Sequence, residues 1–357
     1  MFPCILSEFM PHTPDPNKIS KKKQFYPVNE RLRRYLREYD RAAPLPISYQ
    51  DLLHFSDAYP LFDRHGRDTL WQTVVYDQSQ MPLIYNGLLR IYVQLKSGGG
   101  ESVLEQLSVQ RVDYCTFGNS NPFRIRIVNL LNDNYDYFYF KKADASRIYG
   151  LELEHVLSPN RINYLVQDGS LIEEHIAGIP GDEFIKSYLD RPNLNKVRIA
   201  KEFVKFNERC FALLLGDMRS YNYVVVVTPD FEDEQYRVRP IDFDQESYEG
   251  RKSMYLPQYF KDNNPIVALC TRWLHTETMK QYQNEERTLL FRRIRSARYR
   301  LKDLIDCLRK DVISTPEKVQ QLRHELAAHH QNQDFYQCQS MGDIVRLQLK
   351  LMVRHLK

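Results

Sequence analysis

The chain has 357 residues, of which 43% are hydrophobic and 27% charged, and its formal net charge is +4. This length allows two or three lobes with sizeable cores, and so small a net charge gives little reason to expect a nucleic-acid partner. The six cysteines are scattered singly with no C-x-x-C pair, which is typical of a protein in a reducing cytosol. No apolar run is long enough for a signal peptide or a membrane span. We therefore expect a cytoplasmic protein without a membrane partner.

The first hundred residues are expected to form an extension ahead of the main fold. Residues 1–27 are rich in proline and lysine and predict a loose arm. Residues 28–43 carry apolar side chains at helical spacing and stop before a pair of prolines, which predicts a helix. Residues 69–96 have a β-like texture in LWQTVVYD and LLRIYVQLK. The glycine run SGGGE after them predicts a linker, because no Gly-Lys-Ser/Thr follows.

Residues 101–180 predict a small antiparallel sheet. Apolar and polar residues alternate in FRIRIV and YDYFYFK, and the polar turns GNSN and NDN separate three runs between residues 102 and 142. A helical stretch, SRIYGLELEHVL, follows them. Two further short strands, INYLV and SLIEEHI, are joined by QDG.

Residues 181–357 predict a mostly helical part that contains one hairpin. The stretch NKVRIAKEFVKFNERCFALLL is helical, and the hairpin is made of YVVVVT and YRVRPIDFD. From about residue 263 the chain reads as helix, with one long helix expected over 282–310. The arginines of that helix predict a solvated basic face.

Two acids and an amide near the hairpin suggest phosphoryl-transfer chemistry. Asp217 and Asn222 lie five residues apart on a polar turn, and Asp242 ends the second strand of the hairpin. The D-x-x-x-x-N spacing is that of a kinase catalytic loop, in which the Asp orients the acceptor hydroxyl and the Asn helps to hold Mg²⁺. A carboxylate and an amide oxygen are hard ligands that suit Mg²⁺. The alternative is an ordinary polar turn and a strand end.

This part of the chain resembles a known family. Residues 216–227 and 240–245 are similar to the HGDLHPGNVLV … VIDFE signature of the aminoglycoside phosphotransferase and choline kinase group, within the protein-kinase-like superfamily. Leu215 stands where the family usually has His, a structural prop for the loop. Arg219 stands where the family has His or Lys, and the resemblance implies a cation that meets the transferring phosphate. A surface arginine on a turn is the alternative.

The segment FGNSNPFRIRIV, residues 117–128, resembles the family's glycine-rich turn GGxxNxxYRV. Small residues in such a turn let backbone N–H groups approach phosphates. A plain hairpin turn would have the same sequence pattern. The resemblance implies nucleotide contacts from the turn residues Gly118, Asn119, Ser120 and Asn121.

One strand later, YFYFKKAD offers Lys141 and Lys142 for the lysine that contacts the α- and β-phosphates. Only one of two neighbours in an alternating strand can face a cleft, and we prefer Lys141 because it follows the apolar Phe140. Its partner carboxylate is expected on the next helix, as Glu152 or Glu154 in LELEH.

The segment SLIEEHIAGIPGDEF, residues 170–184, resembles the family's hinge LVMEYIPGEPL. An extended hinge offers backbone N–H and C=O groups to the edge of an adenine. The resemblance therefore implies that the base lies against Glu174, His175 and Ile176. Without the resemblance, the segment predicts a strand that runs into a Pro-Gly turn.

The resemblance covers roughly residues 105–250 and implies an α+β, bilobal protein-kinase-like fold. It places a small antiparallel β-sheet N-lobe with its hinge in residues 101–180 and a mostly helical C-lobe in residues 181–357, behind the N-terminal extension of residues 1–100. It implies an ATP:Mg²⁺-dependent phosphotransferase for a small-molecule hydroxyl or amine, with Asp217 and Arg219 catalytic and Asn222 and Asp242 on the metal. A kinase-like module that holds nucleotide or a partner without turnover stays open as the alternative, because the His is missing and the turn has one glycine. The acceptor is not indicated.

Overall fold

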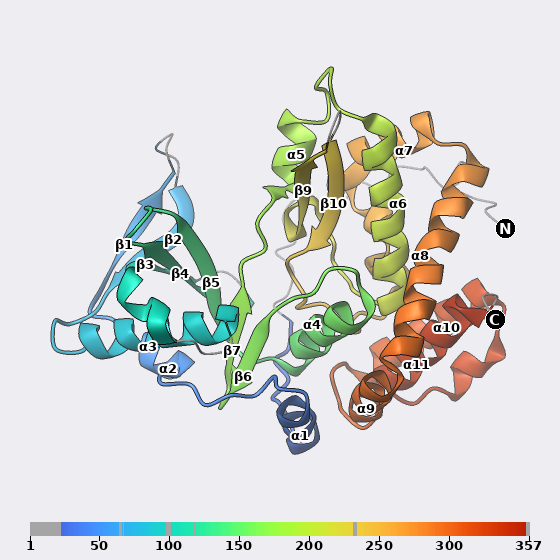
Figure 1. Cartoon of the computed structure of the whole chain (residues 1–357). Helices are drawn as coiled ribbons and strands as arrows, with labels where there is room; N and C mark the ends of the chain where they lie inside the picture. The colour runs from blue at the N-terminus through green and yellow to red at the C-terminus, as the bar shows by residue number, and fades with distance from the viewer. Residues whose placement is uncertain are drawn as a thin grey trace.

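The computed structural model describes residues 23–63, 66, 68–97, 101–116, 119–230 and 234–354. Within them the chain forms a mixed α/β fold with one larger antiparallel sheet, one smaller sheet and a group of helices (Figure 1). Gly118 and the glycines of SGGGE lie outside the described residues.

The larger sheet has seven strands in the order β1-β2-β3-β4-β5-β7-β6, and every neighbouring pair is antiparallel. The alternation in FRIRIV sets the register, because Phe123, Ile125 and Ile127 point into the core while the residues between them are less buried. The predicted three-strand meander and the two later strands are thus confirmed. The strands are β1 (Asp57–Phe62), β2 (Asp68–Val75), β3 (Leu107–Cys115), β4 (Phe123–Asn129), β5 (Tyr135–Lys142), β6 (Tyr164–Gln167) and β7 (Ser170–Glu174).

The segment from residue 69 to residue 96 is strand only in its first part. Helix α3 (Met81–Ser97) packs on the larger sheet, where Ile84, Leu88 and Ile91 share a core with Phe138. Their spacing of four and three residues is the helical period, so the β-like interpretation of LLRIYVQLK is wrong. β1 and β2 come from the first hundred residues, yet they extend the same sheet as β3 to β7.

The smaller sheet, in the order β10-β9-β8, lies among the helices of the second half of the chain (Figure 1). It contains the predicted hairpin, whose strands pair from Tyr223↔Pro240 to Pro229↔Glu234. Its strands are β8 (Ile179–Pro180), β9 (Tyr223–Pro229) and β10 (Glu234–Pro240).

The helices pack mainly around α6, which carries the buried face of NKVRIAKEFVKFNERCFALLL. The other α-helices are α1 (Glu30–Glu38), α2 (Tyr49–Leu52), α4 (Ala145–Leu157), α5 (Gly181–Ser187), α7 (Asn264–Trp273), α8 (Thr276–Ser296), α9 (Arg298–Arg309), α10 (Pro316–His330) and α11 (Met341–Met352), and α6 spans Lys196–Leu213. Short 3₁₀ turns are η1 (Glu101–Gln106), η2 (Ser220–Asn222), η3 (Lys252–Tyr255), η4 (Pro257–Tyr259), η5 (Lys261–Asn263) and η6 (Gln333–Gln337).

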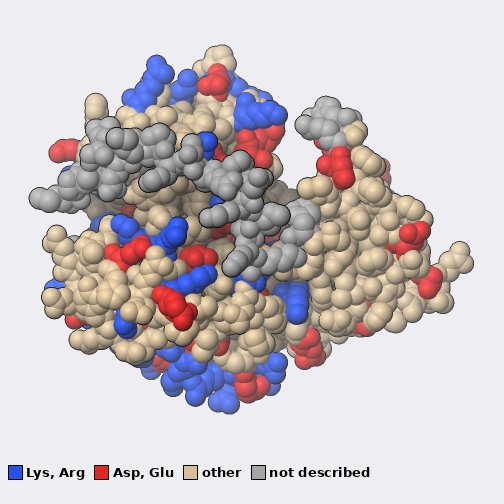
Figure 2. All heavy atoms as spheres, turned by 180° about the vertical axis from the view of Figure 1, so that it is seen from behind, with Lys and Arg blue, Asp and Glu red and all other residues tan. Residues whose placement is uncertain are grey.

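The long helix expected over residues 282–310 is two helices, α8 and α9, which meet at Ala297 with φ −104° and ψ 25°. The apolar spacing runs through the break, but the two halves pack on different partners. α8 packs on α6, and α9 packs on α1 and α11. Figure 2 shows Lys and Arg gathered along one margin of this helical part, with Asp and Glu among them.

The start of the described chain is docked rather than loose. Lys23 Nζ lies 2.7 Å from Asp144 Oδ1, and the Tyr26 N–H donates to Asp144 Oδ2 over 3.0 Å. Tyr26 is buried, as are Leu32 and Tyr35 of the predicted helix α1. The loose-arm prediction is therefore wrong for residues 23–27, and residues 1–22 lie outside the described part.

Candidate functional site

The hairpin brings Asn222 and Asp242 to one end of the smaller sheet. β9 begins at Tyr223 opposite Pro240, the last residue of β10. The Ile241 N–H donates to the Asn222 carbonyl over 3.0 Å, which ties together the two residues that flank this end of the hairpin. The backbone thus brings the two segments side by side, and the convergence of the two side chains on one cation stays a prediction.

The loop that carries Asp217 is anchored to the turn after β10. α6 ends at Leu213, the capping residue Leu214 has φ 59°, and Leu215 forms an isolated β-bridge with Glu246. The Gly216 N–H donates to the Gln245 carbonyl over 3.2 Å. Leu215 is buried at this bridge, so an apolar side chain holds the loop at the position where the resembled family has His.

Asp217 has an uncommon backbone conformation that its neighbours stabilise. Its φ is 58°, in the left-handed region that Asp tolerates better than most residues. Its N–H donates to the Met254 carbonyl over 2.9 Å, and its carbonyl accepts from Asn222 Nδ2 over 2.7 Å. Since the amide nitrogen of Asn222 is engaged in this way, its Oδ1 is the atom that is left to face a ligand.

The carboxylate of Asp217 accepts a hydrogen bond of 3.0 Å from Arg219 Nε. Burial raises the pKa of Asp217 to about 6, although Arg219 opposes the shift and the charge of Asp242 adds to it. Arg219 also lies 3.8 Å from Asp262, so its guanidinium spans two carboxylates on this surface. A carboxyl group with this pKa is mostly ionised at neutral pH and still basic enough to accept a proton.

Of the two candidate lysines, Lys141 is buried and Lys142 is exposed. Lys141 Nζ lies 2.7 Å from Glu173 Oε2 on the adjacent strand β7. Burial would raise the pKa of Glu173, but the charges of Arg147 and Lys141 hold it at about 2. This acid is therefore ionised at neutral pH.

The expected pairing of the lysine with Glu152 or Glu154 is wrong. Glu152 is fully buried and accepts from Tyr35 Oη over 2.7 Å, from Tyr164 Oη over 2.6 Å and from Arg300 Nε over 2.6 Å. Glu154 faces Arg209 at 3.9 Å. Glu152 therefore faces α1 and α9 and Glu154 faces α6, while the acid beside Lys141 is Glu173.

The side chain that α4 directs toward Lys141 and Asp242 is Arg147, which the sequence interpretation missed. Its Nε and Nη2 donate to the two oxygens of Glu173, the Nη2 bond measuring 2.7 Å. Its Nη1 donates to Asp242 over 2.7 Å and to Asp244 over 2.8 Å. The sequence signal that could have identified Arg147 is a charged residue in a helix that is apolar and buried around most of its circumference. A charge in such a place must be paired.

Asp244 also escaped the sequence interpretation. Burial pushes the pKa of Asp244 up, but Arg147 and Lys141 outweigh burial and leave it below its usual range. α4 approaches this acidic turn so closely that a Cβ on Gly150 would lie 2.9 Å from Glu246 Cβ. Helix, sheet and hairpin are therefore held together at this point.

The proposed phosphate turn lies at the end of the sheet that also carries Lys141, because Phe123 pairs with Phe140. Asn121 has φ 43°, donates from Nδ2 to the Thr116 carbonyl over 2.9 Å, and its carbonyl accepts from Tyr49 Oη over 2.8 Å. Asn119 is exposed and Ser120 is half-buried. Asn121 therefore bonds to the Cys115 and Thr116 carbonyls of its own turn and to Tyr49.

The proposed hinge connects the two sheets. β7 ends at Glu174, whose carboxylate accepts from the Asn163 N–H over 2.8 Å. The His175 ring lies 5.6 Å from Tyr137 and 5.9 Å from Tyr139, centroid to centroid. Ile176 is buried, and the chain then enters β8 at Ile179.

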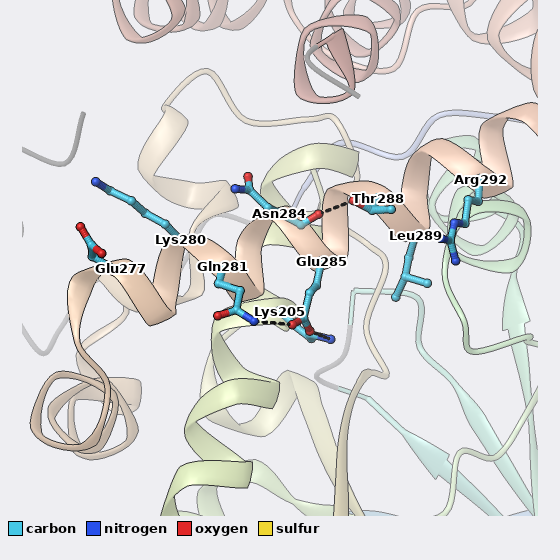
Figure 3. A pocket seen from close by; sticks show the side chains of 9 residues that line it. All are labelled: Lys205, Glu277, Lys280, Gln281, Asn284, Glu285, Thr288, Leu289 and Arg292. Carbon is cyan, nitrogen blue, oxygen red and sulfur yellow. Dashed lines mark hydrogen bonds and ion pairs between the residues drawn. The ribbon is translucent and has the colours of Figure 1, made fainter. Parts of the chain in front are cut away.

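A wide, open cavity of about 700 Å³ lies elsewhere, on the surface along α8 beside Lys205 of α6 (Figure 3). Lys205, Gln281 and Glu285 are among the side chains that line it, and Lys205 pairs with Glu285 at 2.9 Å. No residue predicted for the site lines this cavity. Within the described ranges, no group of three or more His, Cys, Asp and Glu is arranged to hold a metal ion, and no helix has both the length and the apolar character to span a bilayer.

Similarity to solved structures is low, as two titin kinase structures illustrate. No family model matches the chain, and no curated protein matches it. "Titin kinase and its flanking domains" has 14% identity and a TM-score of 0.27, over 70% of this chain and 55% of that one. The autoinhibited serine kinase domain of titin has 13% identity and a TM-score of 0.27, over 68% and 92%.

The chain spans about half the length of the first of these structures, 55%. TM-scores of 0.27 carry no assignment of family or fold. The kinase-like interpretation therefore depends on the chain's own residues.

Proposed function

We propose that the chain has a bilobal kinase-like fold and is an ATP- and Mg²⁺-dependent phosphotransferase that acts on a hydroxyl or amine of a small molecule. The seven-stranded sheet would be the smaller lobe and the helical part with the hairpin the larger one. The cytoplasm is the proposed location, since the cysteines of the described residues are free thiols.

One observation carries this proposal. Lys141 on β5, Glu173 on β7, Arg147 on α4 and Asp242 after β10 form a continuous series of contacts, each 2.8 Å or shorter. The segments that carry them are far apart in the sequence. Two of them, β5 and the turn after β10, are the segments in which the resembled family has its phosphate-binding lysine and its metal-binding acid. Phosphoryl transfer depends mainly on positioning and charge neutralisation by such parts.

The residues at the end of the hairpin fit a magnesium ion by their chemistry. Asp242 is about one-third exposed, 32% of its side chain, and Asn222 has its Oδ1 left for a ligand. Both are hard oxygen donors. A bound Mg²⁺ would neutralise charge on the β- and γ-phosphates, and Asn222 and Asp242 would hold it.

The other roles belong to this chain's own groups. Lys141 would contact the α- and β-phosphates from its buried position beside Glu173, and the turn at residues 119–121 would cover them. Glu174, His175 and Ile176 would lie along the base. Asp217 would accept the proton of the acceptor hydroxyl, and Arg219, which already orients Asp217, would meet the transferred phosphate.

The test is ATP binding measured by calorimetry with Mg²⁺ and with EDTA, followed by a radiolabelled screen of small-molecule alcohols and amines. The proposal expects metal-dependent binding and transfer to at least one acceptor. Binding without transfer across a broad panel would favour the second candidate, a kinase-like module without turnover. No ATP binding under either condition would refute the phosphotransferase and a nucleotide-holding module alike, and would leave a module that holds a partner.

A further inference from the structure

The guanidinium of Arg147 uses all of its nitrogens within one acidic cluster. Nε and Nη2 form a bidentate pair with Glu173, and Nη1 is shared between Asp242 and Asp244 at 2.7 and 2.8 Å. Nη2 also lies 3.4 Å from the Ile241 carbonyl. The side chain is 2% exposed, so these contacts replace water entirely.

The charges in the cluster nearly balance without any bound ion. Lys141 and Arg147 face Glu173, Asp242 and Asp244, which leaves a single excess negative charge. A divalent cation bound to Asp242 would make the net charge of the cluster positive as long as Arg147 stays in place. Like charges at such short range in a buried site repel strongly.

The two aspartates differ in their freedom to leave Arg147. The side chain of Asp244 is 9% exposed, and that of Asp242 is 32% exposed. Rotating Asp242 toward solvent would break its bond to Arg147 and its 3.1 Å bond from the Asp244 N–H. Arg147 would keep Glu173 and Asp244, so the buried charge would not be left unpaired.

We propose that Arg147 is a resident cation that competes with a divalent metal for Asp242. In the absence of nucleotide, Arg147 holds Asp242 and metal affinity is low. When metal and nucleotide bind together, Asp242 turns to the metal while Arg147 remains on Asp244 and Glu173. Arg147 thus sets the affinity of the site for a divalent ion. Only the nucleotide-bound state in this inference rests on the proposed function.

The test is Mn²⁺ binding without nucleotide, followed by the electron paramagnetic resonance signal of free Mn²⁺. The variants are Arg147→Gln, which removes the competing charge, and Arg147→Lys, which keeps it. Arg147→Gln with Glu173→Gln removes one cation and one anion and so leaves the net charge of the cluster unchanged. Asp242→Asn is made in the wild-type and Arg147→Gln backgrounds, and thermal unfolding checks that each variant is folded.

We expect Arg147→Gln and the charge-matched double variant to bind Mn²⁺ at least about tenfold more tightly than the wild type. Arg147→Lys should bind as weakly as the wild type, and Asp242→Asn should abolish the gain. A folded Arg147→Gln variant with unchanged Mn²⁺ affinity would overturn the proposal. A gain in Mn²⁺ affinity in Arg147→Gln that is absent from a folded double variant would also overturn the proposal, because that gain would come from net charge alone.

If neither variant that lacks Arg147 folds, Mn²⁺ binding by the single variant Asp242→Asn, compared with the wild type, tests the proposal. The proposal expects Asp242→Asn to leave Mn²⁺ binding unchanged there, because Arg147 occupies that carboxylate. A large loss of Mn²⁺ affinity would show that Asp242 already binds metal and would overturn the proposal. Since no measurement here uses nucleotide, failure of ATP binding would refute the proposed function and leave this inference standing.

Discussion

Lys141 and Glu173 form a 2.7 Å ion pair across the adjacent strands β5 and β7. The pair lies within the sheet, so the position of the lysine is set by strand pairing and not by the placement of α4. α4 reaches the same carboxylate through Arg147. A movement of α4 would therefore change the environment of Asp242 and Asp244 while Lys141 keeps its partner.

The first prediction compares the two neighbouring lysines. Lys141→Met should weaken ATP binding by about tenfold or more, because a buried cation that faces the phosphates would be lost. Lys142→Met is the matched control, since Lys142 is exposed and its ammonium lies over the Phe25 ring. Calorimetric titration with Mg²⁺–ATP measures both. Equal, small effects would mean that β5 does not supply the phosphate-binding lysine.

The elements with strong local patterns could be predicted from the sequence. The alternation in FRIRIV and YDYFYFK predicts β4 and β5, and the turn after YVVVVT predicts the hairpin that brings Asn222 near Asp242. The helical period of Ile84, Leu88 and Ile91 was also present, and the β-branched and aromatic content of that stretch obscured it.

The charge partners of α4 could not be predicted in the same way. Arg147 and Glu152 are five residues apart, so they project about 140° apart around the helix, and only one of them can face the sheet. Which one does so depends on how α4 packs against α6, α8 and α9, elements far away in the sequence. The lysine–glutamate pair of the resembled family therefore selects Glu152 at the interface of α4 with the sheet, where the structure has Arg147.

The second prediction concerns the buried network around Glu152. Glu152→Gln should lower the free energy of unfolding by about 3 kcal/mol, because Tyr35, Tyr164 and Arg300 would each lose a buried anionic acceptor. Glu30→Gln is the control, since that acid pairs with Arg37 on the surface and should change stability by less than about 0.5 kcal/mol. Urea unfolding followed by circular dichroism measures both. A cost for Glu152→Gln as small as that of the control would contradict the network.

The third prediction is a pH dependence of stability from Glu246. Burial raises the pKa of Glu246 from 4.5 to about 8, although Ser247 donates to its carboxylate. The folded state therefore binds a proton between these pH values that the unfolded state has released, so this contribution to stability is present below pH 4.5 and is lost as the pH rises through 8.

Glu246→Gln mimics the protonated acid and should flatten that dependence. Relative to the wild type, the variant should gain stability on going from pH 6 to pH 8.5. Thermal unfolding at the two pH values, with Glu30→Gln as the control, provides the measurement. An identical difference between wild type and variant at both pH values would show that Glu246 is not protonated in the folded protein.

The last prediction separates turnover from binding. In the proposed site Asp217 acts on the acceptor, so its loss should affect the transition state and leave Mg²⁺–ATP affinity nearly intact. Asp217→Asn suits the test, because Asn tolerates the left-handed backbone at φ 58° and only the basic oxygen is lost. A positioned base contributes about 10² to 10⁴ in rate, so the transfer rate should fall by that factor. Asp242→Asn should weaken Mg²⁺-dependent ATP binding as well, since it removes a proposed metal ligand. If Asp217→Asn changes neither binding nor stability and the wild-type protein transfers no phosphate, Asp217 has no acceptor to act on and the chain is a binding module.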